Sequence, residues 1–485
     1  MFQLVAKNFS ILTAAQLADA AIGFLLIAIA ARLLGPAQLG TFILIGAYVR
    51  LVSFTVNAGV GPIAFRELAR QRSGALNLFE DIVSLRLTLG IAGYLALIAV
   101  LLLLGEDREF LALVAIAAIP LILDPLTESY AAYYTAHERV GIPSAYGLAS
   151  SALSAAGGIA VLLAGFGLAA FIASGAVTSL IVTVVWTIAF RTKIYRFTFR
   201  PRLAAWWRLF MLIIPFAPIH LCNQLDRVIN VILLGRISGP IPMEQSVGYY
   251  GPAQSVTNSA VNLVMSLRRV LIPPVAARLS QGYTVTHELD LALKLVLAVF
   301  ALPLILGTWF MAPELVSLLF GERFGPSAMA LVMLGWAGAL QIAAIAPEAF
   351  LFSHPNHKMQ DYIVGALMSV FVNALVCILL IEEYGFVGAA AGAVAGRLVY
   401  FVYVVHYCRR QLGSQALHLQ QFGDTTLLLL SGFGVWYLAF ALLANAWVAC
   451  AVSVILTLPL IAGFIVYLRP RWSPNRRPDP SSPNP

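Results

Sequence analysis

Apolar runs of about 20 residues recur along the whole chain, and they constrain the fold more than any other feature. A helix needs about 20 mostly apolar residues to cross the hydrocarbon core of a bilayer. The sequence offers fourteen such runs: 10–34, 40–64, 80–104, 110–136, 142–165, 168–190, 209–235, 247–275, 289–311, 327–352, 361–382, 387–407, 424–443 and 446–468. We therefore predict an all-α polytopic membrane protein with about fourteen transmembrane helices.

The composition leaves little room for a soluble domain. Of the 485 residues, 60% are apolar and 11% are charged, whereas soluble domains average about 45–50% and about 25%. A soluble protein of this size would lack the charge to cover its surface. The longest polar stretches are 191–208, 276–288 and the tail 469–485, whose Pro- and Arg-rich sequence predicts disorder.

The basic residues predict the orientation of the helices, because cytoplasmic loops of membrane proteins collect Lys and Arg. With both termini cytoplasmic, 22 of the 30 basic residues fall in inside loops and 4 in outside loops. The other four lie within predicted spans: Arg50, Arg86, Arg227 and Arg397. The net charge of +8 therefore reflects membrane topology, and we expect no nucleic acid partner.

The sequence lacks the motifs of cofactor binding and catalysis. No lysine follows a glycine, so the chain has no P-loop for ATP, and it contains neither HExxH nor GxSxG. The four cysteines lie in or beside apolar segments without a CxxC pair, which argues against a zinc site or a disulfide framework. We expect no cofactor, no bound metal and no catalytic residue.

Weak internal similarity indicates a repeat. Gly40 and Gly248 occupy the same place after the first and seventh spans, 208 residues apart, and Gly167 and Gly385 align 218 residues apart. Six spans per repeat give two lobes with the same orientation in the membrane. The predicted division is 1–208 for the first lobe and a cytoplasmic linker, 209–408 for the second lobe, 409–468 for two extra helices and 469–485 for a cytoplasmic tail.

Five motifs together resemble a known family. They are ARLLGPAQLGTF (31–42), AGVGPIAFRELAR (58–70), NQLDRVINVILLG (223–235), LLFGERFGPSA (318–328) and YGFVGAAAGAVAGRL (384–398). They look like the Wzx-type polysaccharide flippases of the MOP exporter superfamily, and the resemblance covers nearly the whole chain. The lipid II flippases are close relatives, but their characteristic Arg-rich first span is missing here. Multidrug (MATE) exporters share the fold but usually lack spans 13 and 14.

The resemblance implies a function. Flippases of this kind translocate undecaprenyl-pyrophosphate-linked oligosaccharides across the bacterial inner membrane, so a lipid-linked oligosaccharide and the lipid bilayer are the expected partners. A polysaccharide polymerase is a further candidate partner. The alternatives are a MATE-like ion-coupled exporter of small molecules and an integral-membrane glycan-processing enzyme. The enzyme is the weaker alternative, because the longest outside segment, 312–326, offers only Glu314, Glu322 and Arg323 as chemical groups.

The four arginines within spans are the candidate substrate-binding residues. A charge at the centre of a spanning helix costs at least about 2.5–3.5 kcal/mol, so it usually faces a bundle interior or an aqueous cavity. We predict that Arg50, Arg227 and Arg397 line a cationic cavity for a pyrophosphate or acidic sugars. Arg86 is a weaker candidate, because it lies six residues into its span and could instead reach the cytoplasmic interface.

Polar stripes on three spans extend the predicted cavity. The candidate lining residues are Asn57, Asn223, Asn230, Asn258 and Asn262. Asn57 shares a helical face with Arg50, and Asn223 and Asn230 share one with Arg227. Packing of small polar residues between helices is the alternative explanation, above all for the eighth span.

Acidic residues within spans are candidates for coupling to a proton or a sodium ion. They are Asp19, Asp124, Glu128 and Asp226. Asp124 and Glu128 are four residues apart on one helical face, where two carboxylates repel unless one is protonated or a cation intervenes. Salt bridges to Arg50 or Arg86 and hydrogen bonds to neighbouring helices are the structural alternatives.

Overall fold

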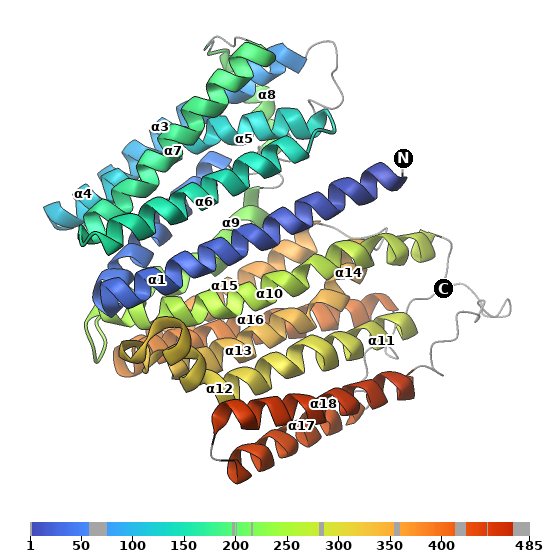
Figure 1. The fold of residues 1–485 in the computed structure, drawn as a ribbon. Coiled ribbons are helices and arrows are strands. Elements are labelled where there is room, and N and C mark those ends of the chain that lie inside the picture. The colour runs from blue at the N-terminus through green and yellow to red at the C-terminus, as the bar shows by residue number, and fades with distance from the viewer. Residues whose placement is uncertain are drawn as a thin grey trace. The chain divides into compact units, whose positions relative to one another are not determined.

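All the regular secondary structure in the described residues is helical. The computed structural model describes residues 2–57, 75–195, 199, 201–214, 217–280, 286–353, 359–412, 423–443 and 445–468. Within them, ten helices are long and apolar enough to cross a membrane. The chain is therefore a multi-pass all-α membrane protein, as predicted. Figure 1 shows the order of the helices along the chain.

Contacts divide the chain into two units, which we describe separately. The first consists of residues 1–236 and 241–251, and the second of residues 237–240 and 252–485. The helices of the first unit are α1 (Phe2–Asn57), α3 (Ala75–Leu103), α4 (Arg108–Ala117), α5 (Pro120–Ala136), α6 (Gly141–Leu163), α7 (Gly167–Lys193), α8 (Leu203–Ile213) and α9 (Ala217–Leu234). Helix α9 thus packs with the first unit, although the repeat assigns it to the second lobe. The lobe boundary at 208/209 stays a prediction about the repeat.

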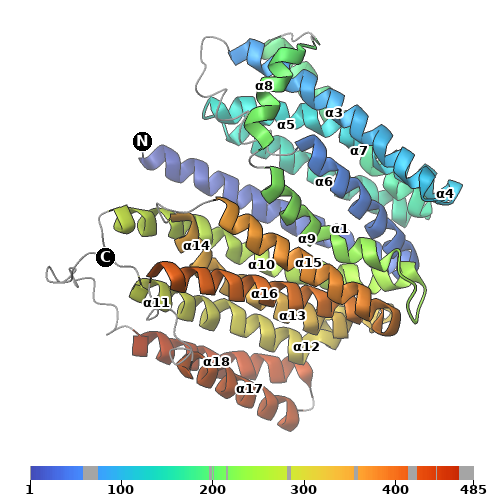
Figure 2. The ribbon, with the colours of Figure 1, turned by 180° about the vertical axis from the view of Figure 1, so that it is seen from behind.

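The first two predicted spans form one helix with a sharp bend. The apolar stretch Ala14–Ser53 is 40 residues long, about twice the length that one crossing needs. The bend falls at Gly35, whose φ of 75° suits glycine, and at Pro36. Figure 2 shows α1 turning back at this point, so α1 supplies two spans.

The bend of α1 meets the first turns of α10 (Met243–Ser280) in a reciprocal backbone contact. A Cβ atom added to Gly40 would collide with the carbonyl oxygen of Glu244, and one added to Gly248 would collide with that of Pro36. Both pairs of equivalent positions, 36 with 244 and 40 with 248, are 208 residues apart. A contact in which i meets j and j meets i is typical of a two-fold axis. It supports the predicted repeat in the predicted register.

The second pair of repeat glycines also matches. Gly167 begins α7 with a φ of 75°, and Gly385, with a φ of 55°, immediately precedes α16 (Phe386–Leu412). A positive φ is easy only for glycine. The same local turn therefore opens the last helix of each repeat.

An aromatic cluster and a proline break organise the first unit. Phe79, Tyr130 and Phe190 stack at centroid distances of 4.7–6.0 Å. The predicted fourth span is broken, because α4 ends at Ala117 and α5 begins at Pro120. Pro125 frees the carbonyl of Leu121, and Gly90 on α3 lets that helix approach the same carbonyl closely.

The second unit contains the rest of α10 and eight further helices. They are α11 (Thr286–Val296), α12 (Leu302–Phe320), α13 (Ser327–Ala343), α14 (Ile345–Ser353), α15 (Met359–Tyr384), α16, α17 (Gly423–Leu442) and α18 (Ala446–Leu468); a π-helical turn, Leu297–Ala301, joins α11 to α12. Helices α15 and α16 pack closely through Gly388, Gly392 and Gly396, the small-residue spacing that membrane helices use for close approach.

The last two helices also belong to the second unit. Helices α17 and α18 pack on each other and on α12, and both views show them side by side in red. Phe310 of α12 contacts Phe433, Trp436 and Phe440 of α17 at centroid distances of 5.3–5.8 Å. Large aromatic contacts of this kind attach the two extra helices firmly.

Candidate functional site

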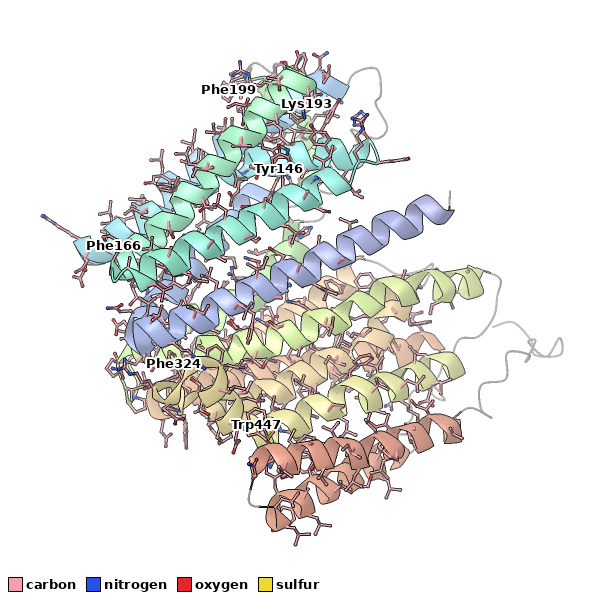
Figure 3. All side chains as sticks on the ribbon, in the orientation of Figure 1. Tyr146, Phe166, Lys193, Phe199, Phe324 and Trp447 are labelled. Atoms are coloured by element: carbon pink, nitrogen blue, oxygen red, sulfur yellow. The ribbon has the colours of Figure 1, made fainter. Side chains whose placement is uncertain are left out.

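Four helices of the first unit form the walls of an open cleft of about 650 Å³. Its walls come from α1, α5, α6 and α7, and Tyr146 of α6, labelled in Figure 3, stacks on Trp186 of α7 at one side. A smaller recess of about 200 Å³ shares Asp124, Thr127 and Ser150 with it. Three of the predicted coupling carboxylates, Asp19, Asp124 and Glu128, all line this cleft.

Serine hydroxyl groups on the opposite helices hold two of these carboxylates. Ser151 of α6 donates a hydrogen bond to Asp19 of α1. Ser179 of α7 donates one to Oδ1 of Asp124 on α5, at 2.9 Å. Each hydrogen bond joins helices that are far apart in sequence, so both carboxylates are fixed in position. Among the described residues, neither Asp19 nor Asp124 has a basic partner.

The third carboxylate has a cationic partner. Nη1 of Arg86 on α3 lies 3.5 Å from Oε2 of Glu128 and 3.4 Å from the hydroxyl of Ser129. Arg86 is 1% exposed, whereas the side chain of Glu128 is 45% exposed toward the cleft. Arg86 is therefore a buried counter-ion to Glu128, whereas the sequence left open whether it lines a cavity or reaches the cytoplasmic interface.

The negative charges in the cleft therefore outnumber the positive ones among the described residues. The Arg86–Glu128 pair is neutral, which leaves the carboxylates of Asp19 and Asp124 without compensation by a described residue. These two carboxylates remain the predicted candidates for coupling to a proton or a sodium ion. Within the described part of the chain, no group of three or more His, Cys, Asp or Glu side chains is arranged to hold a metal ion.

Two of the predicted arginines lie near each other on another face of the first unit. Arg50 of α1 and Arg227 of α9 are both exposed, and the charge of Arg227 acts on Arg50. Gln224 donates a hydrogen bond of 2.9 Å to the carbonyl of Arg50 and so ties α9 to α1. Within the described residues, the Arg50 guanidinium forms no ion pair. Two adjacent cations of this kind attract an anion, and guanidinium pairs well with phosphate.

The predicted stripe on α9 is only partly exposed. Asn223 and Arg227 are exposed and Asp226 is half-buried, but Asn230 is 2% exposed. Asn230 is therefore buried, and its place in the predicted cavity stays a prediction. The stripe was drawn from helical periodicity alone, and that periodicity continues past the point where α9 packs against its neighbours.

The remaining candidates lie elsewhere. In the second unit, Asn258 and Asn262 are exposed on α10 and Arg397 is half-buried on α16. Asn57 is the last residue of α1, and its side chain lies outside the described residues. The structure thus joins Asp19, Asp124 and Glu128 in one cleft and brings Arg50 near Arg227.

Sequence reasoning missed the hydroxyl groups of the cleft. Ser150, Ser151 and Ser154 on α6 and Thr178, Ser179 and Thr183 on α7 line the cleft or its recess. Their spacing of three and four residues was visible in the sequence. Small hydroxyl residues are so common in membrane helix packing that the spacing alone does not mark a site.

The fold and the cleft define the class of protein. Apolar spanning helices in two repeated halves, with charged groups held inside the bundle, are typical of a membrane transporter. A family model described as "Polysaccharide biosynthesis protein" matches residues 29–329, and the chain belongs to this family.

Solved structures show the same fold. The chain is similar to a structure of the lipid II flippase MurJ in an inward closed conformation, with 15% identity, a TM-score of 0.75, and coverage of 96% of this chain and 100% of that one. An inward-facing MATE multidrug transporter of the MOP superfamily matches with 15% identity and a TM-score of 0.60 over 82% and 95%. A MATE transporter of Vibrio cholerae matches with 17% identity and a TM-score of 0.54 over 85% and 98%. No curated protein sequence matches the chain significantly.

Proposed function

We propose that this protein is a flippase that moves an undecaprenyl-pyrophosphate-linked oligosaccharide across the bacterial inner membrane by alternating access. The observation that carries the proposal is the family match over residues 29–329. The fold adds to it, because the similarity to a lipid-linked-substrate flippase extends over 96% of the chain. The proposal includes cytoplasmic termini, no enzymatic activity and a polysaccharide polymerase as a partner.

The head group would be recognised by charge. Arg50 and Arg227 are exposed and the charge of one acts on the other, and Arg397 is the candidate in the second unit. A pyrophosphate offers several oxygens to such guanidinium groups. The lipid tail would stay in the bilayer while the head group crosses through a water-filled path.

Complementation of a flippase-deletion strain tests this proposal. The variants are Arg50→Ala, Arg227→Ala and Arg397→Ala, each beside the charge-preserving change to Lys. We expect the Ala variants to accumulate lipid-linked glycan on the inner leaflet while the Lys variants retain part of the activity. Full activity of all three Ala variants at normal expression would contradict the cationic path.

The acidic cleft supports the second candidate function, an ion-coupled small-molecule exporter. Asp19 and Asp124 would bind a proton or a sodium ion in either case, so the cleft alone does not separate the two functions. The extent of the structural matches favours the flippase. The MATE structures cover 82–85% of this chain, whereas the flippase structure covers 96%. Deletion of the gene separates them: accumulated glycan on the lipid carrier supports the flippase, and drug sensitivity with normal glycan supports the exporter.

A further inference from the structure

Helix α8 presents an apolar stripe outward from the first unit. Leu203, Trp207, Phe210, Met211 and Ile214 recur at helical spacing, and all five are exposed, Leu203 at 75% and Trp207 at 62%. The stripe is one face of a helix that is apolar almost throughout, with Arg208 as its one charged residue. Nothing in the first unit covers it among the described residues.

The opposite face of α8 is fastened to α3. Trp206 donates a hydrogen bond of 3.1 Å to the hydroxyl of Ser84, and Leu209 is 5% exposed within the aromatic cluster. Arg202, just before α8, forms an ion pair of 2.7 Å with Asp81. These contacts fix the orientation of α8, so the direction of its apolar stripe is set by the fold.

Helix α8 is a short apolar helix that precedes α9 in the chain. It has 11 residues, about half the number that one crossing needs. Helix α9 has 18 residues, and at about 1.5 Å per residue it spans about 27 Å, close to the thickness of the hydrocarbon core. A short helix with an exposed apolar face and a basic residue is suited to the membrane interface.

Basic side chains lie on α8 and at the end of α7. Arg191 and Lys193 end α7 and Arg208 lies within α8; all three are exposed, and none forms an ion pair with a described residue. Lys193 and Phe199 lie together at this end of the unit, away from Phe166 (Figure 3). Near the opposite end, the α3–α4 turn carries Glu106, Asp107 and Glu109 around Arg108, so the charge is strongly uneven.

We propose that α8 and the basic end of α7 form a binding surface for anionic phospholipid head groups of the bilayer. The apolar stripe would enter the acyl-chain boundary, Trp207 would lie at the head-group level, and Arg191, Lys193 and Arg208 would pair with lipid phosphates. Tryptophan and basic residues favour this depth. The surface is separate from the acidic cleft and from the Arg50–Arg227 pair, so it goes beyond the proposed transport function.

Lipid competition on the full-length protein tests the charge. The purified protein is titrated with phosphatidylglycerol and with phosphatidylcholine, and the bound lipids are counted by native mass spectrometry. We expect Arg191→Gln/Lys193→Gln/Arg208→Gln to weaken phosphatidylglycerol binding roughly tenfold, since each surface basic residue adds to anionic lipid affinity. Arg108→Gln at the acidic end is the matched control and should bind as the wild type does. A triple variant with unchanged phosphatidylglycerol preference would overturn the proposal.

Fluorescence quenching tests the stripe independently. The difference between wild type and Trp207→Phe in nanodiscs isolates the emission of Trp207. We expect brominated phospholipid to quench this emission and iodide to have little access to it. Quenching by iodide without quenching by brominated lipid would place the stripe in water, as for a soluble protein partner, and would overturn the proposal.

Discussion

At the scale of single residues, the charges within the spans divide into structural and functional groups. Arg86 is 1% exposed with Glu128 as its counter-ion, whereas Asp19 and Asp124 have only serine donors among the described residues. We expect Glu128→Gln to lower the free energy of unfolding by about 1–3 kcal/mol, because it leaves the Arg86 charge buried. Breaking a fully buried ion pair costs about 3–5 kcal/mol. We expect a smaller loss here because Glu128 is 45% exposed.

Asp19→Asn and Asp124→Asn should behave in the opposite way. An amide still accepts the serine hydrogen bond, so thermal unfolding in detergent should change little, while transport driven by an ion gradient in proteoliposomes should be lost. Glu109→Gln, an exposed acid of α4, controls for the loss of one negative charge. Normal ion-driven transport by both Asn variants would remove the cleft from the coupling mechanism.

At the scale of helices, the crossing of α1 with α10 depends on two glycines. A methyl group at Gly40 or Gly248 would meet backbone carbonyls, which cannot move aside as a flexible side chain can. Overpacking typically costs about 1–3 kcal/mol. We expect Gly40→Ala and Gly248→Ala each to lower the free energy of unfolding by at least this amount, which is measured as a lower unfolding temperature.

Gly46→Ala is the matched control, because Gly46 lies within α1 with nothing within 4 Å of an added Cβ. Replacing an unhindered helical glycine by alanine should be neutral or stabilise by about 0.5–1 kcal/mol. Equal unfolding temperatures for Gly40→Ala, Gly248→Ala and Gly46→Ala would show that the crossing is not closely packed.

The helices could be predicted from the sequence because the bilayer imposes a simple rule. A span of apolar residues must satisfy its own backbone hydrogen bonds, so the predicted spans are mostly helical wherever the structure describes them, with breaks at 118–119 and 344. The surroundings of a charge follow no such local rule. Arg86 and Arg227 look alike in sequence, and only the packing of α3 against α5 buries one while α9 leaves the other exposed.

At the scale of the whole molecule, a set of contacts that we call the clasp holds the C-terminal end of α9 to the first unit. Arg236, just after α9, forms an ion pair with Glu106 of the α3–α4 turn. It also donates a hydrogen bond of 2.7 Å to the hydroxyl of Tyr48 on α1 and lies 5.6 Å from the centre of that ring. The predicted repeat assigns α9 to the second lobe, so under the proposed alternating access we expect this clasp to open during each cycle.

Chemical cross-linking can test whether the clasp opens. In a Cys450→Ser background, which removes the only cysteine that is not buried among the four, Glu106→Cys and Arg236→Cys are joined by a short reducible bifunctional thiol reagent. We expect transport in proteoliposomes to stop on cross-linking and to return on reduction, because α9 can no longer leave the first unit. The same reagent on each single-cysteine variant should have no effect. A fully cross-linked protein that transports at the uncross-linked rate would show that α9 moves with the first unit throughout the cycle, as the division of contacts places it.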